Sequence, residues 1–179
     1  MPWTSVPEYL RGRETMRRRE LVYGMVREPP SPFYDHQRFL TNLTVLLTTH
    51  VRERALGDVC VAPIDVVLDR RRALIAQPDL VFVSTERLGI IDRQIWGAPY
   101  LVVEVLSPGT AKRDRTTKLG WYQKYGVREC WLVDPIDCSI EVIRLKARTM
   151  TRRKYGEGAV LRSGVIRSLR LRVREVFDE

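Results

Sequence analysis

Two acidic residues stand in stretches of the sequence that are otherwise strongly apolar. Asp79 directly precedes the apolar run 80–83, and Glu104 lies inside the apolar run 101–106. A carboxylate in the middle of such a run is costly to bury unless it is paired or binds a metal. Carboxylates on neighbouring strands offer the oxygen ligands that Mg²⁺ and Mn²⁺ prefer. The alternative is a buried ion pair with one of the many arginines, and the pattern alone leaves both open.

A lysine on the next predicted helix is the third candidate. Asp114, Lys118 and Tyr122 are spaced by four residues and therefore share one helix face. Lys118 is either half of a surface pair with Asp114, worth about 0.3–0.5 kcal/mol, or it points to the end of the strand that carries Glu104. In the second arrangement its ammonium group would orient a water molecule or stabilise charge on a phosphate in the transition state.

The elements that must position these residues follow from the spacing of apolar residues. The continuous runs at 80–83 and 101–106 are typical of central strands in a sheet covered on both faces. Helical spacing predicts helices over 31–55, beginning at Ser31-Pro32, and over 114–125, closed by Gly126. Further predicted elements are a short helix at 6–10, a hairpin of strands 19–22 and 25–27, and strands at 59–62, 66–68, 73–75, 130–133, 139–145, 149–154 and 169–173. We expect one α/β domain over residues 1–179, with helices flanking a mixed sheet.

Positive charge is concentrated near the C-terminus. The chain has 31 Lys and Arg against 22 Asp and Glu, a net charge of +9. Residues 144–174 contain eleven basic side chains and one acidic one, whereas residues 1–143 are close to neutral. This basic segment predicts a polyanionic partner, most commonly a nucleic acid. The alternative is a solvated charged face, because an excess of Arg over Lys also follows from a GC-rich coding bias.

Several classes of protein are disfavoured. Three cysteines without a close pair argue against disulfides and against a zinc site. No Gly-rich phosphate loop is present, so the sequence does not indicate an ATP-driven enzyme. No apolar run approaches the ~20 residues of a membrane span, and the N-terminus lacks a signal pattern. We therefore expect a cytoplasmic protein that does not bind membranes.

Five stretches in a fixed order are more specific. They are QPDLVFV (77–83), GAPYLVVEVLSP (97–108), Asp114 with Lys118, YGV (125–127) and WLVDP (131–135). In this order they resemble the Uma-type family of restriction endonucleases, a branch of the PD-(D/E)xK nuclease superfamily. Residues 20–24 and 32–37 resemble the N-terminal pattern of the family, so the resemblance extends over about residues 14–178.

The resemblance implies a restriction-endonuclease-like α/β fold, with a mixed central β-sheet flanked by helices and an N-terminal β-hairpin. It also implies a DNA endonuclease that hydrolyses phosphodiester bonds with Mg²⁺ or Mn²⁺ as cofactor, and a homodimer. Asp79, Glu104 and the carbonyl group of Val105 would be metal ligands. Glu20 would complete the metal shell, and Lys118 would position the attacking water.

The sequence departs from the superfamily motif at one position. The motif places a lysine two residues after the acid, where this chain has Leu106. The resemblance suggests that Lys118 on the helix supplies the amine instead. The departure leaves two alternatives: a catalytically inactive nucleic-acid-binding protein with the same fold, or an interaction module of a mobile element whose basic segment binds an acidic protein. His36 matches a family position, but a lone histidine there, like His50, is more often a packing residue than a base.

Overall fold

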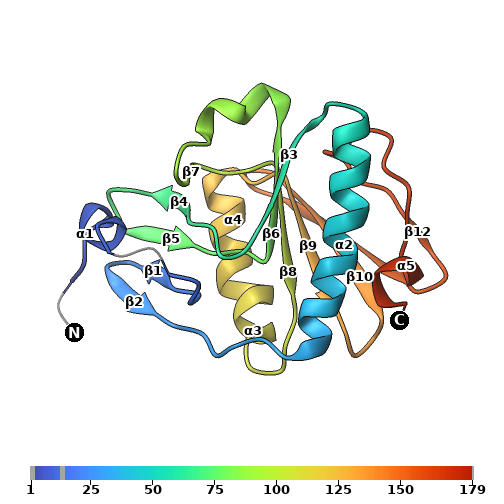
Figure 1. The fold of residues 1–179 in the computed structure, drawn as a ribbon, viewed down its shortest axis with the longest axis horizontal. Coiled ribbons are helices and arrows are strands. Elements are labelled where there is room, and N and C mark those ends of the chain that lie inside the picture. Colours follow the sequence, from blue (N-terminus) through green and yellow to red (C-terminus); the bar gives the residue numbers. More distant parts are fainter. Residues whose placement is uncertain (1–2, 13–14, 179) are drawn as a thin grey trace.

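A six-stranded mixed sheet forms the centre of the protein (Figure 1). The computed structural model describes residues 3–12 and 15–178, so both ends of the expected 1–179 domain lie outside the described residues. The strands, in spatial order, are β11 (Met150–Gly156), β10 (Ser139–Leu145), β9 (Glu129–Asp134), β8 (Leu101–Val105), β6 (Leu80–Ser84) and β3 (Gly57–Val61). β8 and β9 are parallel and the other neighbours are antiparallel. β6 and β8 are buried at every residue, which explains why both read as continuous apolar runs.

The predicted N-terminal hairpin is present, but it does not join the central sheet. It belongs to a second sheet with the order β2 (Met25–Arg27), β1 (Glu20–Val22), β5 (Leu74–Ala76), β4 (Val66–Asp69) and β7 (Ile95–Trp96). Tyr23 and Gly24 form its turn with φ values of 50° and 83°, as a two-residue hairpin turn of type I′ requires. The predicted mixed central sheet and N-terminal hairpin are therefore confirmed, whereas the place of the hairpin in a second sheet is new, because apolar periodicity predicts strands but does not choose their partners.

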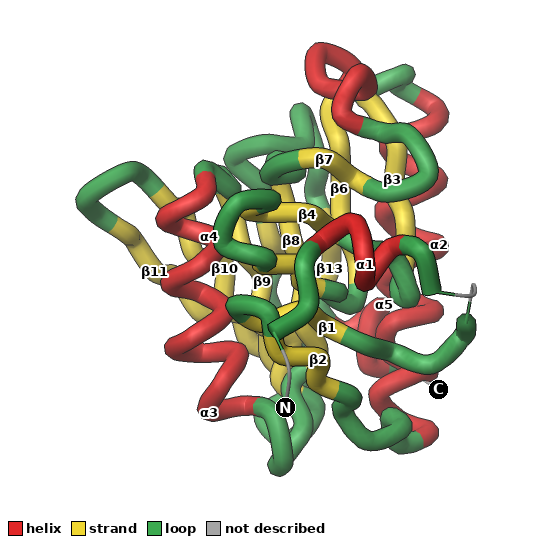
Figure 2. The backbone as a smooth tube through the Cα atoms, turned by 90° about the vertical axis from the view of Figure 1, so that its left-hand side faces the viewer, coloured by secondary structure: helices red, strands yellow, loops and turns green. Residues whose placement is uncertain are grey.

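Two helices lie on opposite faces of the central sheet (Figure 2). Leu80 and Val103 project toward α2 (Tyr34–Glu53), whereas Val81 and Val102 project toward α4 (Leu119–Tyr125) and the second sheet. This alternation follows from the two-residue period of a strand. The central strands therefore have two buried faces, and any polar side chain on them is enclosed by a helix.

The two longer predicted helices differ from expectation at their N-terminal ends, whereas the short helix at 6–10 is present as α1 (Val6–Leu10). α2 begins at Tyr34 with Phe33 as its N-cap, so Ser31-Pro32 does not start it. The segment with Pro29, Pro30 and Pro32 stays outside the helix, and the N-cap Phe33 is itself extended, with φ −74° and ψ 165°.

The predicted helix 114–125 begins earlier and is not a uniform α-helix. It consists of α3 (Ala111–Arg113), a π-helical turn η2 (Asp114–Lys118) and α4, and Gly126 closes it with a φ of 96°. A π-turn of this kind changes the direction in which the following side chains point.

The remaining elements are short. They are α1 (Val6–Leu10), the 3₁₀-helix η1 (Thr85–Ile90), the strand pair β12 (Val160–Leu161) and β13 (Leu171–Arg172), and α5 (Arg174–Phe177). The sequence did not predict α5, which packs Phe177 against Phe39 of α2 with ring centroids 5.0 Å apart. No described helix is long and apolar enough to span a membrane.

The basic segment 144–174 forms the β11 edge of the central sheet and the C-terminal loops. Arg152, Arg153 and Lys154 of β11 are exposed. Some of this charge is paired at the surface, since Arg152 lies 3.3 Å from Glu141 and Lys154 lies 2.6 Å from Asp137. The predicted strands at 149–154 and 169–173 correspond to β11 and to the shorter β13.

Candidate active site

The two acids in the apolar runs project from the same face of the central sheet. Asp79 precedes Val81 by two residues and Glu104 follows Val102 by two, and both valines face α4. Asp79 is only 1% exposed and Glu104 only 2% exposed. Leu106 packs in the apolar cluster beneath α4, so an apolar side chain fills the position of the motif lysine.

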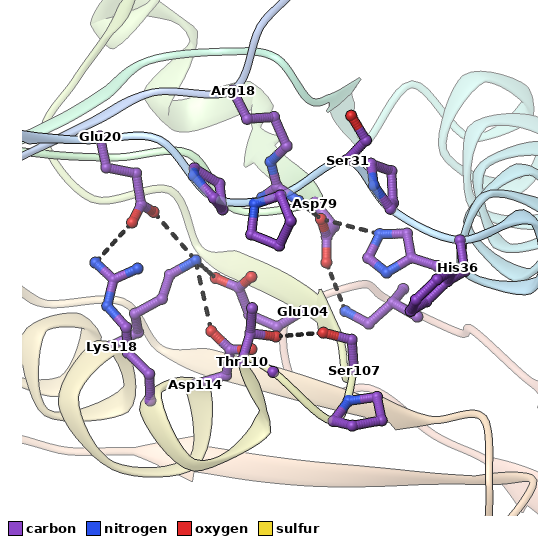
Figure 3. A pocket seen from close by; sticks show the side chains of 18 residues that line it. Arg18, Glu20, Ser31, His36, Asp79, Glu104, Ser107, Thr110, Asp114 and Lys118 are labelled. Atoms are coloured by element: carbon purple, nitrogen blue, oxygen red, sulfur yellow. Dashed lines mark hydrogen bonds and ion pairs between the residues drawn. The ribbon is translucent and has the colours of Figure 1, made fainter.

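Both acids line a cavity of about 430 Å³ together with most of the residues singled out in the sequence (Figure 3). Its charged and histidine lining residues are Arg18, Glu20, His36, Asp79, Glu104, Arg113, Asp114 and Lys118. The lining also includes residues 29–33 before α2, Val105 at the end of β8 and residues 107–110 after it. Segments from β1, β8, α2 and η2 therefore meet here, although they are up to about a hundred residues apart in sequence.

Glu104 is held from the helix side by two donors. Lys118 Nζ lies 2.6 Å from Glu104 Oε1, and the hydroxyl group of Tyr122 donates a short hydrogen bond to the same oxygen. Burial raises the pKa of Glu104 to about 8, with Lys118 opposing the rise and the charges of Asp114 and Asp79 adding to it. Without a further cation, Glu104 therefore holds a proton at neutral pH.

Lys118 is surrounded by carboxylates. Its ammonium nitrogen lies 2.6 Å from Glu104, 3.2 Å from Glu20 and 3.8 Å from Asp114, and its side chain is only 3% exposed. Burial acts to lower the pKa of Lys118, but the three acids outweigh burial and the net pKa is raised. The π-turn that ends at Lys118 brings the side chain to the sheet, and Lys118 remains a cation in this setting.

Glu20 closes the cavity from the second sheet. Its Oε1 accepts a hydrogen bond from the backbone N–H of Gln77 at 3.1 Å, and its Oε2 lies 2.7 Å from Arg113 Nη2. Burial favours the neutral acid, but Lys118 and Arg113 outweigh it and the pKa of Glu20 is lowered. Both oxygens of Glu20 thus already face cationic or polar donors.

Asp79 is held on both oxygens as well. Its Oδ1 lies 2.5 Å from Arg18 Nη1 and 3.3 Å from His36 Nε2, and its Oδ2 accepts the N–H of Val105 at 2.6 Å. Burial acts to raise the pKa of Asp79, but the His36 contact and the Arg18 charge outweigh it, so the net pKa lies below the ordinary value. Asp79 is therefore the ionised member of the strand pair.

The donor chemistry of this cavity fits a hard divalent cation. Among the described residues, no three His, Cys, Asp or Glu side chains form a ready-made metal cluster. Mg²⁺ is, however, usually bound by one or two carboxylates together with water and substrate phosphate. The four acids of the lining exceed its Arg and Lys cations by one negative charge. A bound divalent cation would thus replace the proton of Glu104.

Four residues of the site are not assigned to it by the sequence pattern. The pattern favours a packing role for His36, but His36 contacts Asp79, and the pattern places Tyr122 only on a shared helix face although its hydroxyl group binds Glu104. Arg18 and Arg113 do not stand out because arginines are so frequent in this chain. His36 had a signal in its family position, whereas only the fold could identify the two arginines. His50 is remote from the cavity lining and bonds the carbonyl group of Arg167 at 2.9 Å.

Comparison with known proteins is consistent with this geometry. The family model Uma2, described as "Putative restriction endonuclease", matches residues 6–174. A solved structure from Anabaena variabilis, described as a "putative nuclease belonging to DUF820", is similar to this chain with a TM-score of 0.81 and 18% sequence identity, covering 97% of each chain. At this identity the similarity establishes the fold, which is the restriction-endonuclease-like fold that the sequence predicted. No curated protein matches the chain.

Proposed function

From the premise that this chain belongs to the Uma2 family of restriction endonucleases, we propose that it is a divalent-metal-dependent DNA endonuclease whose active site is the cavity around Asp79 and Glu104. A nuclease acting on nucleic acid is the general activity that the family indicates. The choice of DNA, the metal dependence and a homodimeric state belong to the proposal.

The observation that carries the proposal is the position of the Lys118 ammonium group. It lies 2.6 Å from Glu104, and it reaches this acid from the helix that covers the strand. A lysine two residues after the acid would reach the same face of the strand. Lys118 thus supplies a cation beside the acid although Leu106 occupies the motif position.

Pro78, the residue before Asp79, supports a role for the Val105 carbonyl group. Leu106 donates its N–H to the carbonyl group of Val133 in β9. Because backbone groups along a strand point alternately to its two neighbours, Val105 directs its N–H and carbonyl groups toward β6. The register that pairs Leu80 with Val103 places Pro78 opposite Val105. Proline has no N–H to donate. The Val105 carbonyl is therefore suited to bind a cation together with Asp79 and Glu104.

We assign the remaining side chains by their contacts. A bound Mg²⁺ or Mn²⁺ would supply Lewis-acid activation of a phosphate and a more acidic water. Lys118 stays protonated, so it orients water and stabilises negative charge rather than acting as a base. Glu20, which the family resemblance assigns to the metal shell, instead positions Lys118 and Arg113, because its oxygens already face those groups.

Cleavage of plasmid DNA tests this function directly. Supercoiled plasmid incubated with the protein and Mg²⁺ or Mn²⁺ is expected to be nicked or linearised. Glu104→Gln is expected to abolish cleavage, whereas Glu53→Gln, an exposed acid at the end of α2, is expected to cleave like the wild type. Equal cleavage by wild type and Glu104→Gln would reject the proposed site.

A catalytically inactive nucleic-acid-binding protein is the second candidate. It is favoured by Leu106 at the motif position and by Asp79, whose two oxygens are already held by Arg18, His36 and Val105. This candidate predicts salt-sensitive DNA binding with no cleavage in either metal. The plasmid assay therefore separates the two.

A further inference from the structure

The cavity has two chemically different parts. Its floor is charged, with Glu20, Asp79, Glu104 and Lys118 almost fully buried. Its rim is largely apolar, with Pro29, Pro30, Pro32, Phe33 and Pro108 beside the hydroxyl residues Ser31, Ser107 and Thr110. A ligand that fits both parts carries a phosphate that reaches the floor and a flat apolar group that contacts the rim. A nucleotide has both features.

The rim presents one aromatic ring, that of Phe33, to solvent, and Tyr34 follows it in the sequence. Tyr34 is 79% exposed and Phe33 is 75% exposed, the two highest values among the aromatic side chains of the described residues, and they are adjacent in sequence. Phe33 is the N-cap of α2 but makes no side-chain capping bond. Because both rings are mostly exposed, packing in the core does not explain why aromatic residues occupy these two positions.

The backbone holds Phe33 at the cavity. Prolines at three of the four positions before Phe33 restrict the approach to α2, and His36 on the first turn of the helix contacts Asp79. Three prolines also remove three N–H donors from the rim. The rim is therefore better suited to stacking than to hydrogen bonding with base edges.

A second hollow continues the same surface beyond the proline segment. It has a volume of about 510 Å³, and its lining consists of Thr15, Met16, Arg17, Arg18, Glu28, Ser31 and the same three prolines. Met16 is 82% exposed. The two arginines outnumber the single acid of this hollow, and the surface is longer than one nucleotide needs, which favours a strand over a free mononucleotide.

We propose that Phe33, with Tyr34 beside it, is a stacking platform for an unpaired base next to the scissile phosphate, so that the preferred substrate is single-stranded or locally unpaired DNA. Base faces are covered by their neighbours in a duplex, and an aromatic ring reaches them only where the strand is unpaired. This inference rests on the proposed function for the identity of the cavity as a phosphate site. Stacking on aromatic side chains tolerates any base sequence.

Binding without cleavage tests the platform. Fluorescence anisotropy with the metal chelated would compare a labelled single-stranded oligonucleotide with a duplex of the same length. Phe33→Ala is expected to weaken single-strand binding roughly 5- to 150-fold and to change duplex binding far less. Phe33→Trp is expected to retain single-strand binding, because the larger ring still stacks.

A matched control and a direct probe separate stacking from general effects. Val45→Ala changes another exposed apolar side chain of α2, 60% exposed, and is expected to leave binding unchanged. Quenching of 2-aminopurine in the single strand is expected with wild type and to be lost with Phe33→Ala. Unchanged single-strand affinity in Phe33→Ala, or an equal loss on duplex, would overturn the platform. Because no cleavage is measured, this result is independent of the plasmid assay.

Discussion

Lys118 and Glu104 form a buried pair between a helix and the strand that it covers, with the ammonium nitrogen 2.6 Å from a carboxyl oxygen. Both side chains are 3% exposed. A buried pair of this kind is costly to desolvate, and removing one partner is far more harmful than removing both. The pair therefore links stability to the proposed chemistry, and the two effects can be measured separately.

Replacing Lys118 with methionine is expected to reduce both stability and cleavage. Glu20, Glu104 and Asp114 would lose their shared cation, at a cost of about 3–5 kcal/mol in the free energy of unfolding. Loss of a charge-stabilising donor is expected to lower cleavage by about 10²–10³-fold. Urea denaturation and plasmid cleavage by the folded protein measure the two.

Two variants control this experiment. Lys124→Met, at an exposed position of α4, is expected to be close to wild type in both assays. Lys118→Arg keeps the positive charge and is expected to be more stable than Lys118→Met. Full cleavage by Lys118→Met would show that the ammonium group has no part in the reaction.

The raised pKa of Glu104 predicts a stability that falls with pH in the absence of metal. Below its ordinary value of 4.5, Glu104 is protonated in the folded and the unfolded chain. Between 4.5 and about 8 only the unfolded chain ionises it, so the free energy of unfolding decreases as pH rises through this range. Urea denaturation between pH 5 and 9 is expected to show a smaller decrease for Glu104→Gln than for wild type. Parallel curves for the two proteins would contradict the assignment.

Tyr122→Phe tests the hydroxyl group that shares the Glu104 oxygen with Lys118. Loss of this buried hydrogen bond is expected to cost about 1–3 kcal/mol of stability. Cleavage is expected to fall roughly 10- to 100-fold, as is usual when a residue that orients a metal ligand is lost. Tyr125→Phe on the same helix is the matched control, because its hydroxyl group bonds Asp69 away from the cavity at 2.9 Å. Equal cleavage by both variants would remove Tyr122 from the site.

Arg18 is expected to compete with a divalent cation for Asp79. Its guanidinium group lies 2.5 Å from Asp79 Oδ1 and also donates to the carbonyl group of Gln77. Arg18→Gln removes a positive charge from this position and is expected to strengthen Mn²⁺ binding in isothermal titration calorimetry, whereas Asp79→Asn weakens it. Arg17→Gln, on the exposed neighbouring residue, is the control. Weaker Mn²⁺ binding in Arg18→Gln would show that Arg18 supports the cation site instead.

The exposed arginines of β11 predict a contribution to DNA affinity that depends on salt. Arg152→Gln combined with Arg153→Gln is expected to reduce the slope of log affinity against log salt by about 0.9 for each DNA phosphate that the variant no longer neutralises. The same pair of changes at Arg70 and Arg71, in the exposed turn before β5, is the control. An unchanged slope would place the DNA path elsewhere on the molecule.

Much of the secondary structure and part of the cavity could be predicted from local pattern. The apolar runs around Asp79 and Glu104 predicted two central strands, and β6 and β8 lie inside the six-stranded sheet. The four-residue spacing from Asp114 to Lys118 predicted their shared face, which is buried. These features depend on the periods of strand and helix, which a sequence displays directly.

The partners of the acids could not be predicted in the same way. Arg18 lies 61 residues before the carboxylate that it contacts, and Glu20 reaches Lys118 only because its hairpin joins a second sheet. The chain has 26 arginines, and nothing in the residues around Arg18 distinguishes it from the others. Similarly, the contact of His36, in the first turn of α2, with Asp79 joins two segments that are far apart in the sequence.

The sequence by itself determined where strands and helices form and which face of each is buried, because these follow from the order of apolar and polar residues along a few turns. Only the tertiary structure decided that Lys118 meets Glu104, that Arg18 and His36 meet Asp79, and that Phe33 lies at the rim of the same cavity. The physical reason is that contacts between distant segments are chosen by the packing of the whole core, and no short stretch of chain contains that information.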